Sequence, residues 1–134
     1  MIKYVVGFLF SPDKKSVVLI KKIRPTFQAG LFNGVGGKIE IGETPIQAMT
    51  REFFEETGLT INNWEEYCIL QGDCIVNVFK AIDENYKLVK SQTDENVSIH
   101  NVCSIPLLKV MPNLKWLIPM ATDINHVHCV AIFS

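Results

Sequence analysis

GKIEIGETPIQAMTREFFEETGL, residues Gly37–Leu59, is the stretch from which most of the fold can be predicted. Gly37 and the preceding Gly36 form a glycine pair at its start, and the stretch indicates a loop followed by a helix. Thr44 suits the N-cap of that helix, with Gln47 three residues later to complete a capping box, and Pro45 suits the first helical position because its missing N–H is not needed there. Gly58 suits the residue just after the helix. The pattern therefore predicts a helix that begins at Pro45 and ends before Gly58.

Two kinds of side chain separate around this helix. At about 100° per residue, the apolar side chains fall on one face, which predicts the face that packs on the core. Glutamates gather on an adjoining arc near the C-terminal end, where the helix dipole is already negative, so their charges oppose the helix unless a cation lies among them. Mg²⁺ and Mn²⁺ prefer such hard oxygen ligands. The apolar residues are Ile46, Met49 and Phe53; the glutamates are Glu52, Glu55 and Glu56; Arg51 can neutralise one of them and hold it in orientation.

An acidic helix face also has an ordinary explanation, because most acidic runs are solvated surface. A resemblance of the whole stretch to a known family favours the metal interpretation. The stretch resembles the signature of the Nudix hydrolase family, G-x5-E-x7-R-E-U-x-E-E-x-G-U with U an aliphatic or aromatic residue, and matches it at every fixed position. Those positions are Gly37, Glu43, Arg51, Glu52, Phe53, Glu55, Glu56, Gly58 and Leu59.

Length and composition limit the classes of protein to consider. The chain has 134 residues, about the common size of one domain. Its 13 Lys and Arg balance 14 Asp and Glu, which argues against an extended nucleic-acid surface. Four cysteines show neither a CxxC pair nor metal-ligand spacing, which favours reduced thiols, and the N-terminal apolar run is too short for a membrane span. We expect residues 1–134 to form a single cytoplasmic domain that binds no membrane; the sequence does not indicate its oligomeric state.

The remaining chain is rich in expected strands. Strands at 3–10 and 17–22 are predicted to form a hairpin, followed by a loop at 23–30. A short broken helix is predicted to begin near Asn113, because Pro112 and Pro119 interrupt a leucine-rich segment. Strands outnumber helices without βαβ alternation, which predicts an α+β domain with a mixed sheet. The resemblance implies the α/β/α sandwich of Nudix hydrolases. Further strands are expected at 32–35, 64–71, 74–82, 86–89, 97–102 and 126–133.

The resemblance also implies a chemistry. In Nudix hydrolases, the glycine matching Gly37 gives its carbonyl to the metal and the glutamates matching Glu52, Glu55 and Glu56 supply carboxylates. The cofactor is Mg²⁺ or Mn²⁺, and the glutamate at Glu52 or Glu56 accepts the proton of the attacking water. The attack falls on a phosphorus of a diphosphate bridge. A nucleoside triphosphate would then give a monophosphate and pyrophosphate.

Charged residues outside this stretch are candidates for the same site. Lys38 and Arg24 are candidates for binding the phosphates, and each can also be an exposed basic side chain. In the family a further acidic ligand often comes from a downstream loop. Glu95 fits that place best, with Asp94 as the alternative, and an exposed loop acid remains the ordinary explanation.

Base recognition is predicted from a narrower resemblance. Residues 27–38, FQAGLFNGVGGK, look like the F-G-A-G-x-W-N-G-x-G-G-K segment of the MutT-like, 8-oxo-purine nucleoside triphosphatase branch. This implies that Asn33 reads the purine edge, which suits an amide that offers both a donor and an acceptor, and that Phe27 lines the base pocket. Asn113 stands where that branch has the first of two aspartates and is a third candidate for the base. Met111 replaces a stacking tryptophan, so the base is not identified.

The sequence thus predicts a Mg²⁺-dependent enzyme that hydrolyses a small nucleoside triphosphate, with a role in clearing modified nucleotides. Two alternatives stay open. One is hydrolysis of another nucleoside diphosphate derivative, such as a nucleotide sugar or a capped RNA end. The other is a nucleotide-sensing module without turnover, which would be expected to lose the glutamates that this chain retains.

Overall fold

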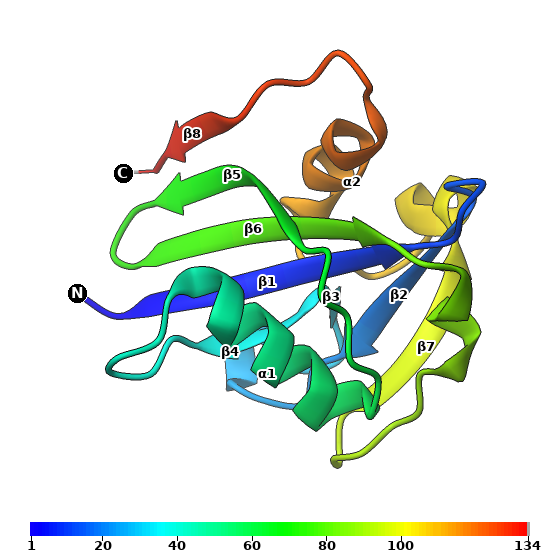
Figure 1. The fold of residues 1–134 in the computed structure, drawn as a ribbon, viewed down its shortest axis with the longest axis horizontal. Coiled ribbons are helices and arrows are strands. Elements are labelled where there is room, and N and C mark those ends of the chain that lie inside the picture. The colour runs from blue at the N-terminus through cyan, green and yellow to red at the C-terminus, as the bar shows by residue number, and fades with distance from the viewer. Residues whose placement is uncertain (134) are drawn as a thin grey trace.

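The computed structural model describes residues 1–133 as a mixed sheet with a helix on each side (Figure 1). Three short 3₁₀ turns, Thr26–Gln28, Glu84–Leu88 and Val102–Leu107, lie between the longer elements. The strands are β1 (Lys3–Phe10), β2 (Ser16–Lys21), β3 (Phe32–Asn33), β4 (Val35–Lys38), β5 (Glu65–Gln71), β6 (Ile75–Ile82), β7 (Asn96–Asn101) and β8 (Cys129–Ile132), and the helices are α1 (Pro45–Thr57) and α2 (Leu114–Thr122).

The strands follow the order β3-β2-β1-β6-β5-β8, with β4 paired to β1 and β7 paired to β2. β1 runs parallel to β6, and β5 runs parallel to β8, whereas the other pairs are antiparallel. The predicted hairpin of β1 and β2 is present, but the two strands meet only near the turn, at Phe10 and Val17. Farther along, β1 pairs with β4, while β2 pairs with β3 and β7. The mixed sheet confirms the predicted fold class.

The side chains of β1 alternate between the two faces of the sheet, which explains how one sheet packs against a helix on each side. Val5 and Leu9 point to a buried cluster that contains Met49 and Phe53 of α1. Val6, Phe8 and Phe10 point to the opposite cluster, which contains the buried leucines of α2. Successive side chains of a strand face opposite sides of a sheet, so one central strand supplies both cores. Figure 1 shows α1 and α2 on different sides of the sheet.

The helix prediction for α1 is confirmed at both ends. The Thr44 hydroxyl accepts a hydrogen bond from the backbone N–H of Gln47, and the Gln47 side chain accepts one from the backbone N–H of Thr44, which is the expected capping box. Gly58 ends the helix in the left-handed region at φ 74°. The apolar face is narrower than predicted, because Ile46 is 44% exposed while Ala48 takes the buried place beside Met49.

Several boundaries differ from the prediction. The glycine pair Gly36 and Gly37 lies inside β4 and not in a loop. Residues 86–89 form no strand, since a 3₁₀ turn covers Glu84–Leu88, and the last strand is confined to Cys129–Ile132. The helix expected near Asn113 begins at Leu114 and continues through Pro119. Neither helix of residues 1–133 has the length and apolar character that a membrane crossing requires.

Candidate active site

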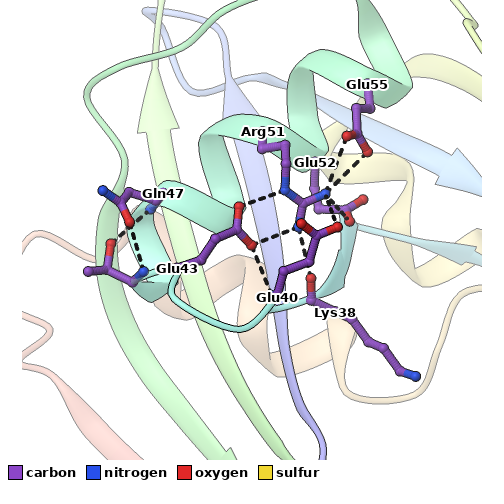
Figure 2. Close-up of polar contacts among 8 residues, drawn as sticks. Lys38, Glu40, Glu43, Gln47, Arg51, Glu52 and Glu55 are labelled. Carbon is purple, nitrogen blue, oxygen red and sulfur yellow. Dashed lines mark hydrogen bonds and ion pairs between the residues drawn. The ribbon is translucent and has the colours of Figure 1, made fainter.

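Arg51 is the centre of a polar network between helix α1 and the end of β4 (Figure 2). Its Nε and Nη2 donate to the two carboxylate oxygens of Glu43 over 2.6 and 2.9 Å, and its Nη1 donates to Glu52 Oε1 over 2.8 Å. Nη1 also donates to Glu55 Oε2 over 3.2 Å, and Nη2 donates to the backbone carbonyl of Lys38 over 3.0 Å. Such charge-assisted, bidentate bonds fix geometry well. Arg51 therefore ties the end of β4 and the following turn to α1.

Glycine is required where β4 meets α1. A Cβ built at Gly37 would overlap the carboxylate of Glu52, so this carboxylate lies directly against the Gly37 backbone. A Cβ built at Gly36 would overlap the backbone carbonyl of Val5 in β1. The two glycines have different roles, because Gly36 allows the strands to approach and Gly37 allows the glutamate to approach the strand.

Burial shifts the pKa values of two glutamates upward. It raises the pKa of Glu52, and the hydrogen bond and charge of Arg51 offset only part of this rise. Burial likewise raises the pKa of Glu56, where a 2.9 Å hydrogen bond from the Thr93 hydroxyl to Oε2 offsets part of it. Desolvation disfavours the charged form of a carboxyl group. Both groups therefore lack full compensation for their negative charge.

Glu95 lies close to these glutamates, but hydrogen bonds from other residues already compensate its negative charge. It is 5% exposed, its Oε1 accepts from Lys22 Nζ over 3.0 Å, and its Oε2 accepts from the backbone N–H of Ile23 over 2.7 Å. Burial alone would raise the pKa of Glu95, but the hydrogen bonds from Ile23 and Lys22 outweigh it and hold this pKa below its usual value. Its neighbour Asp94 forms an exposed ion pair with Arg24, 2.6 Å from Nη2 to Oδ2.

The acidic side chains do not converge on one point as they stand. Within residues 1–133, no three His, Cys, Asp or Glu side chains are close enough together to hold a metal ion. Glu52 is turned to Arg51, Glu56 to Thr93, and Glu95 to Lys22. The donor set nevertheless has the chemistry of a hard-cation site, because Glu52 and Glu56 are partly buried carboxylates whose raised pKa values reflect uncompensated charge.

A pocket of about 390 Å³ lies beside the glutamates. The three residues predicted to contact a base, Phe27, Asn33 and Asn113, all line it, together with Gly37 and Lys22. Gly37 and Lys22 also contact the acidic cluster, through Glu52 and Glu95 respectively, so the pocket and the cluster adjoin. The pocket is lined by loop residues before β3 and by residues of β1, β3, β4, β5, β6 and α2.

Two residues that line this pocket, Asn113 and Asn33, carry polar groups without a hydrogen-bond partner in the part of the chain that the structure describes. The Oδ1 atom of Asn113 is buried and finds no hydrogen-bond partner among residues 1–133, which is costly for a polar atom. Oδ1 of Asn33 accepts from the backbone N–H of Gly34 over 2.8 Å, which leaves its amide nitrogen as the donor. Phe27 is 74% exposed at the pocket edge. The pocket thus offers one acceptor and one donor beside an aromatic ring.

Arg24 and Lys38, the two basic residues predicted to bind the phosphates, are not directed at the pocket or at the carboxylates. Arg24 is engaged with Asp94 and does not line the pocket. The side chain of Lys38 points away from the carboxylates in Figure 2, although its carbonyl belongs to the Arg51 network. Sequence reasoning missed Lys22, which lines the pocket and pairs with Glu95, and Thr93, which holds Glu56. Lys22 is the last residue of a predicted strand, and Thr93 lies in a polar loop. The sequence around each residue does not distinguish it from an ordinary exposed polar residue.

Two comparisons of the sequence with known proteins identify relatives of this chain. The family model of the NUDIX domain matches residues 1–107. An oxidized purine nucleoside triphosphate hydrolase of Danio rerio is 35% identical over 85 residues, and the match covers 58% of this chain and 53% of that protein. The match therefore spans about half the length of that relative.

Solved structures share the fold at low sequence identity. The NUDIX domain of Shewanella oneidensis NrtR, in complex with ADP ribose, is 19% identical and superimposes with a TM-score of 0.76 over 87% of this chain and 83% of that one. A MutT protein from Bacillus halodurans is 20% identical, with a TM-score of 0.72 over 98% of this chain and 87% of that one. The NUDIX model covers most of the chain and the motif is complete, so this chain belongs to the Nudix hydrolase family.

Proposed function

We propose that this protein hydrolyses a purine nucleoside triphosphate, including oxidised forms, to the monophosphate and pyrophosphate with the help of Mg²⁺ or Mn²⁺. One observation carries the proposal: the acidic cluster of α1 adjoins a pocket with unpaired polar groups. The cluster supplies carboxylates for a cation and a base, while the pocket supplies donor and acceptor groups suited to a nucleobase. The relative in Danio rerio, named as an oxidized purine nucleoside triphosphate hydrolase, supports the choice of substrate class.

The metal would be held by the carboxylates of Glu52, Glu55 and Glu56 with the carbonyl of Gly37. The raised pKa values of Glu52 and Glu56 support this assignment, because a cation would supply the compensation that the protein lacks. When bound, the cation neutralises phosphate charge and makes water easier to deprotonate. Arg51 keeps Glu52 against the Gly37 backbone and so pre-organises this part of the site.

Glu56 is our choice for the group that accepts the proton of the attacking water. Thr93 holds one of its carboxylate oxygens, whereas Glu52 is bound by the Arg51 guanidinium. A carboxylate with a raised pKa is a better proton acceptor near neutral pH than an ordinary one. The Thr93 hydroxyl oxygen also accepts a hydrogen bond from the backbone N–H of Glu95 over 3.2 Å. The orientation of Glu56 is therefore linked to the loop that carries Glu95.

Lys22 is better placed than Lys38 or Arg24 to neutralise the phosphates. It lines the pocket, pairs with Glu95, and lies close enough to Glu56 to oppose the rise of its pKa. Glu95, predicted from the sequence as a further metal ligand, holds Lys22 and the backbone N–H of Ile23 in this structure. We infer that Glu95 positions Lys22 beside the reacting phosphates.

The base is recognised by Asn33 and Asn113. A purine edge presents a donor and an acceptor side by side, which the amide nitrogen of Asn33 and Oδ1 of Asn113 complement. The buried acceptor gains most from a ligand, because it has no protein partner to give up. Met111 and Phe27 give the pocket apolar surface for the faces of the base.

The test is a substrate panel on the wild type and two variants. Asn113→Leu removes the buried acceptor, and we expect a KM about tenfold higher for the preferred purine with kcat little changed, from roughly 1.5 kcal/mol of lost recognition. Asn62→Leu, at an exposed asparagine outside the pocket, is the matched control and keeps the wild-type KM. The panel contains ordinary and oxidised nucleoside triphosphates, ADP-ribose and nucleotide sugars. Faster turnover of a nucleotide sugar or ADP-ribose than of every triphosphate would refute the assigned substrate class.

A further inference from the structure

Two cysteines that lie far from the acidic cluster face one another in the sheet. Cys68 of β5 and Cys129 of β8 are register partners across the parallel pair, and their Sγ atoms are 3.6 Å apart. Both side chains belong to the core on the α2 side of the sheet. Cys129 Sγ is also 3.8 Å from Met120 Sδ of α2. Neither cysteine lines the pocket of the candidate active site.

The backbone geometry suits a covalent bond between these sulfurs. Neighbouring strands lie about 4.8 Å apart, and a disulfide accepts Cα separations of roughly 4.4 to 6.8 Å. Since Cys68 and Cys129 are directly opposite and their sulfurs are already in contact, bond formation requires side-chain rotation and no change of register. The other two cysteines, Cys74 and Cys103, have no such contact with a cysteine within the described chain.

The bond would join distant parts of the chain. β8 is a four-residue strand at the edge of the sheet, next to the longer interior strand β5. It follows α2, and the Cys129–Met120 contact connects it to that helix. A cross-link between residues so far apart in sequence restricts the unfolded chain strongly, so it is expected to stabilise the folded state.

We propose that Cys68 and Cys129 form a reversible dithiol–disulfide site, which a peroxide closes and a thiol reductant opens. In the first step the sulfur of Cys129 attacks one oxygen of hydrogen peroxide, which gives a sulfenic acid and one water. In the second step the sulfur of Cys68 attacks the sulfenic sulfur, the S–S bond forms, and a second water leaves. The two thiols together lose two protons and two electrons, which reduce the peroxide. A dithiol reductant returns them.

The order of the two steps follows from exposure. Cys68 is buried and Cys129 is partly exposed, so a dissolved peroxide reaches Cys129 first. Burial also raises the pKa of the Cys68 thiol to about 12, which keeps this thiol protonated and slow to react with solvent oxidants. Cys68 then acts as the resolving thiol, because it is the neighbour of any sulfenic acid formed on Cys129.

The experiment uses the full chain with Cys74→Ser and Cys103→Ser, so that Cys68 and Cys129 are the only thiols left. After treatment with hydrogen peroxide we expect an intact mass lower by two hydrogen atoms, no free thiol after denaturation, a monomeric band on a non-reducing gel, and a Tm higher by on the order of 10 °C. Dithiothreitol should reverse the changes in mass, free thiol and Tm and leave the band monomeric. The same chain with Cys129→Ala in addition should keep its mass, its free Cys68 thiol and its Tm after the same treatment.

Other outcomes would overturn the proposal. Addition of oxygen without loss of hydrogen would show that Cys129 is oxidised but not resolved by Cys68. A disulfide-linked dimer without the intramolecular product would show that the two sulfurs do not meet. If the double-serine chain does not fold, peptide mapping of the peroxide-treated wild type decides the question, since the proposal requires a linked pair of peptides that contain Cys68 and Cys129.

Discussion

At the scale of single residues, the hydroxyl of Thr93 decides how Glu56 is held. The loop that carries Thr93 is hydrogen-bonded to the C-terminal end of α1, from the backbone N–H of Lys90 to the carbonyl of Thr57 and from that of Gln92 to the carbonyl of Glu56. These bonds use carbonyls that a helix end otherwise leaves unpaired. They place the Thr93 hydroxyl 2.9 Å from Glu56 Oε2.

Replacing Thr93 by valine keeps the shape of the side chain and removes this hydrogen bond. We expect kcat to fall on the order of tenfold, since a hydrogen bond to a charged group contributes about 1.5 kcal/mol or more, while KM and Tm change little. Thr93→Ser keeps the hydroxyl and should restore most of kcat. Steady-state kinetics with Mg²⁺ and thermal melts measure these effects. Equal kcat in the wild type and Thr93→Val would remove Thr93 from the positioning of Glu56.

At the scale of elements, strand β4 and helix α1 act as one unit. Gly36 lets β4 lie against Val5 of β1, and Gly37 lets the Glu52 carboxylate lie on the strand. Arg51 then connects the helix to the carbonyl at the end of β4. The position of the carboxylates thus depends on how closely a strand and a helix approach, and not on the helix alone.

The two glycines allow a paired test of this unit. Gly37→Ala should displace the Glu52 side chain, weaken Mn²⁺ binding and lower kcat on the order of tenfold or more with a small loss of Tm, because a flexible side chain moves more easily than backbone. Gly36→Ala should lower Tm more, because its Cβ meets the backbone of Val5. Thermal melts and Mn²⁺ titration by electron paramagnetic resonance distinguish them. Unchanged Mn²⁺ affinity in Gly37→Ala would contradict the proposed role of Glu52.

The elements that the sequence predicts well have strong local signals. Helix α1 carries its own capping box and C-terminal glycine, and β1 and β6 are long, mostly apolar segments. Their secondary structure can therefore be predicted from residues within each element. Strand β4 is different, because Gly36 and Gly37 have poor strand propensity and are held there by pairing with β1. Lys22 and Thr93 could not be predicted as site residues for a similar reason: only the tertiary fold brings them to Glu95 and Glu56.

At the scale of the whole molecule, stability is expected to depend on pH through His100. This histidine of β7 packs edge-on against Phe32 at 4.6 Å between ring centroids, with Nε2 2.6 Å from the Ser98 hydroxyl. Burial lowers the pKa of His100 below its ordinary 6.5. As pH falls from this ordinary value through the lowered one, the unfolded chain takes up a proton that the folded chain does not, so stability is lost.

His100→Gln tests this linkage. Between pH 7 and pH 5 the Tm of the wild type should fall more than that of the variant, because glutamine does not titrate. The difference should be small above pH 7, where the histidine is neutral in both states. Thermal melts across this range provide the measurement. Parallel pH profiles for the two proteins would show that His100 does not contribute.

The arrangement of the strands also explains why the acidic cluster and the pocket adjoin. Strand β1 supplies both cores, pairs with β4 beside α1, and contributes Tyr4, Val5 and Val6 to the pocket. Asn113 directly precedes α2, which packs on the face of the sheet opposite to α1, and it lines the same pocket. In the proposed reaction, α1 and the residue that precedes α2 would contact one ligand, and the central strand β1 connects them.

The central claim is that the glutamates at the end of α1 catalyse metal-dependent hydrolysis of a nucleoside triphosphate. The most direct measurement is the release of pyrophosphate from the preferred triphosphate, with Mg²⁺ or with EDTA, by the wild type and by Glu56→Gln. We predict pyrophosphate release by the wild type with Mg²⁺, none with EDTA, and a kcat lower by about a hundredfold or more for Glu56→Gln at unchanged folding. Wild-type rates in Glu56→Gln, or equal rates with EDTA, would contradict the claim.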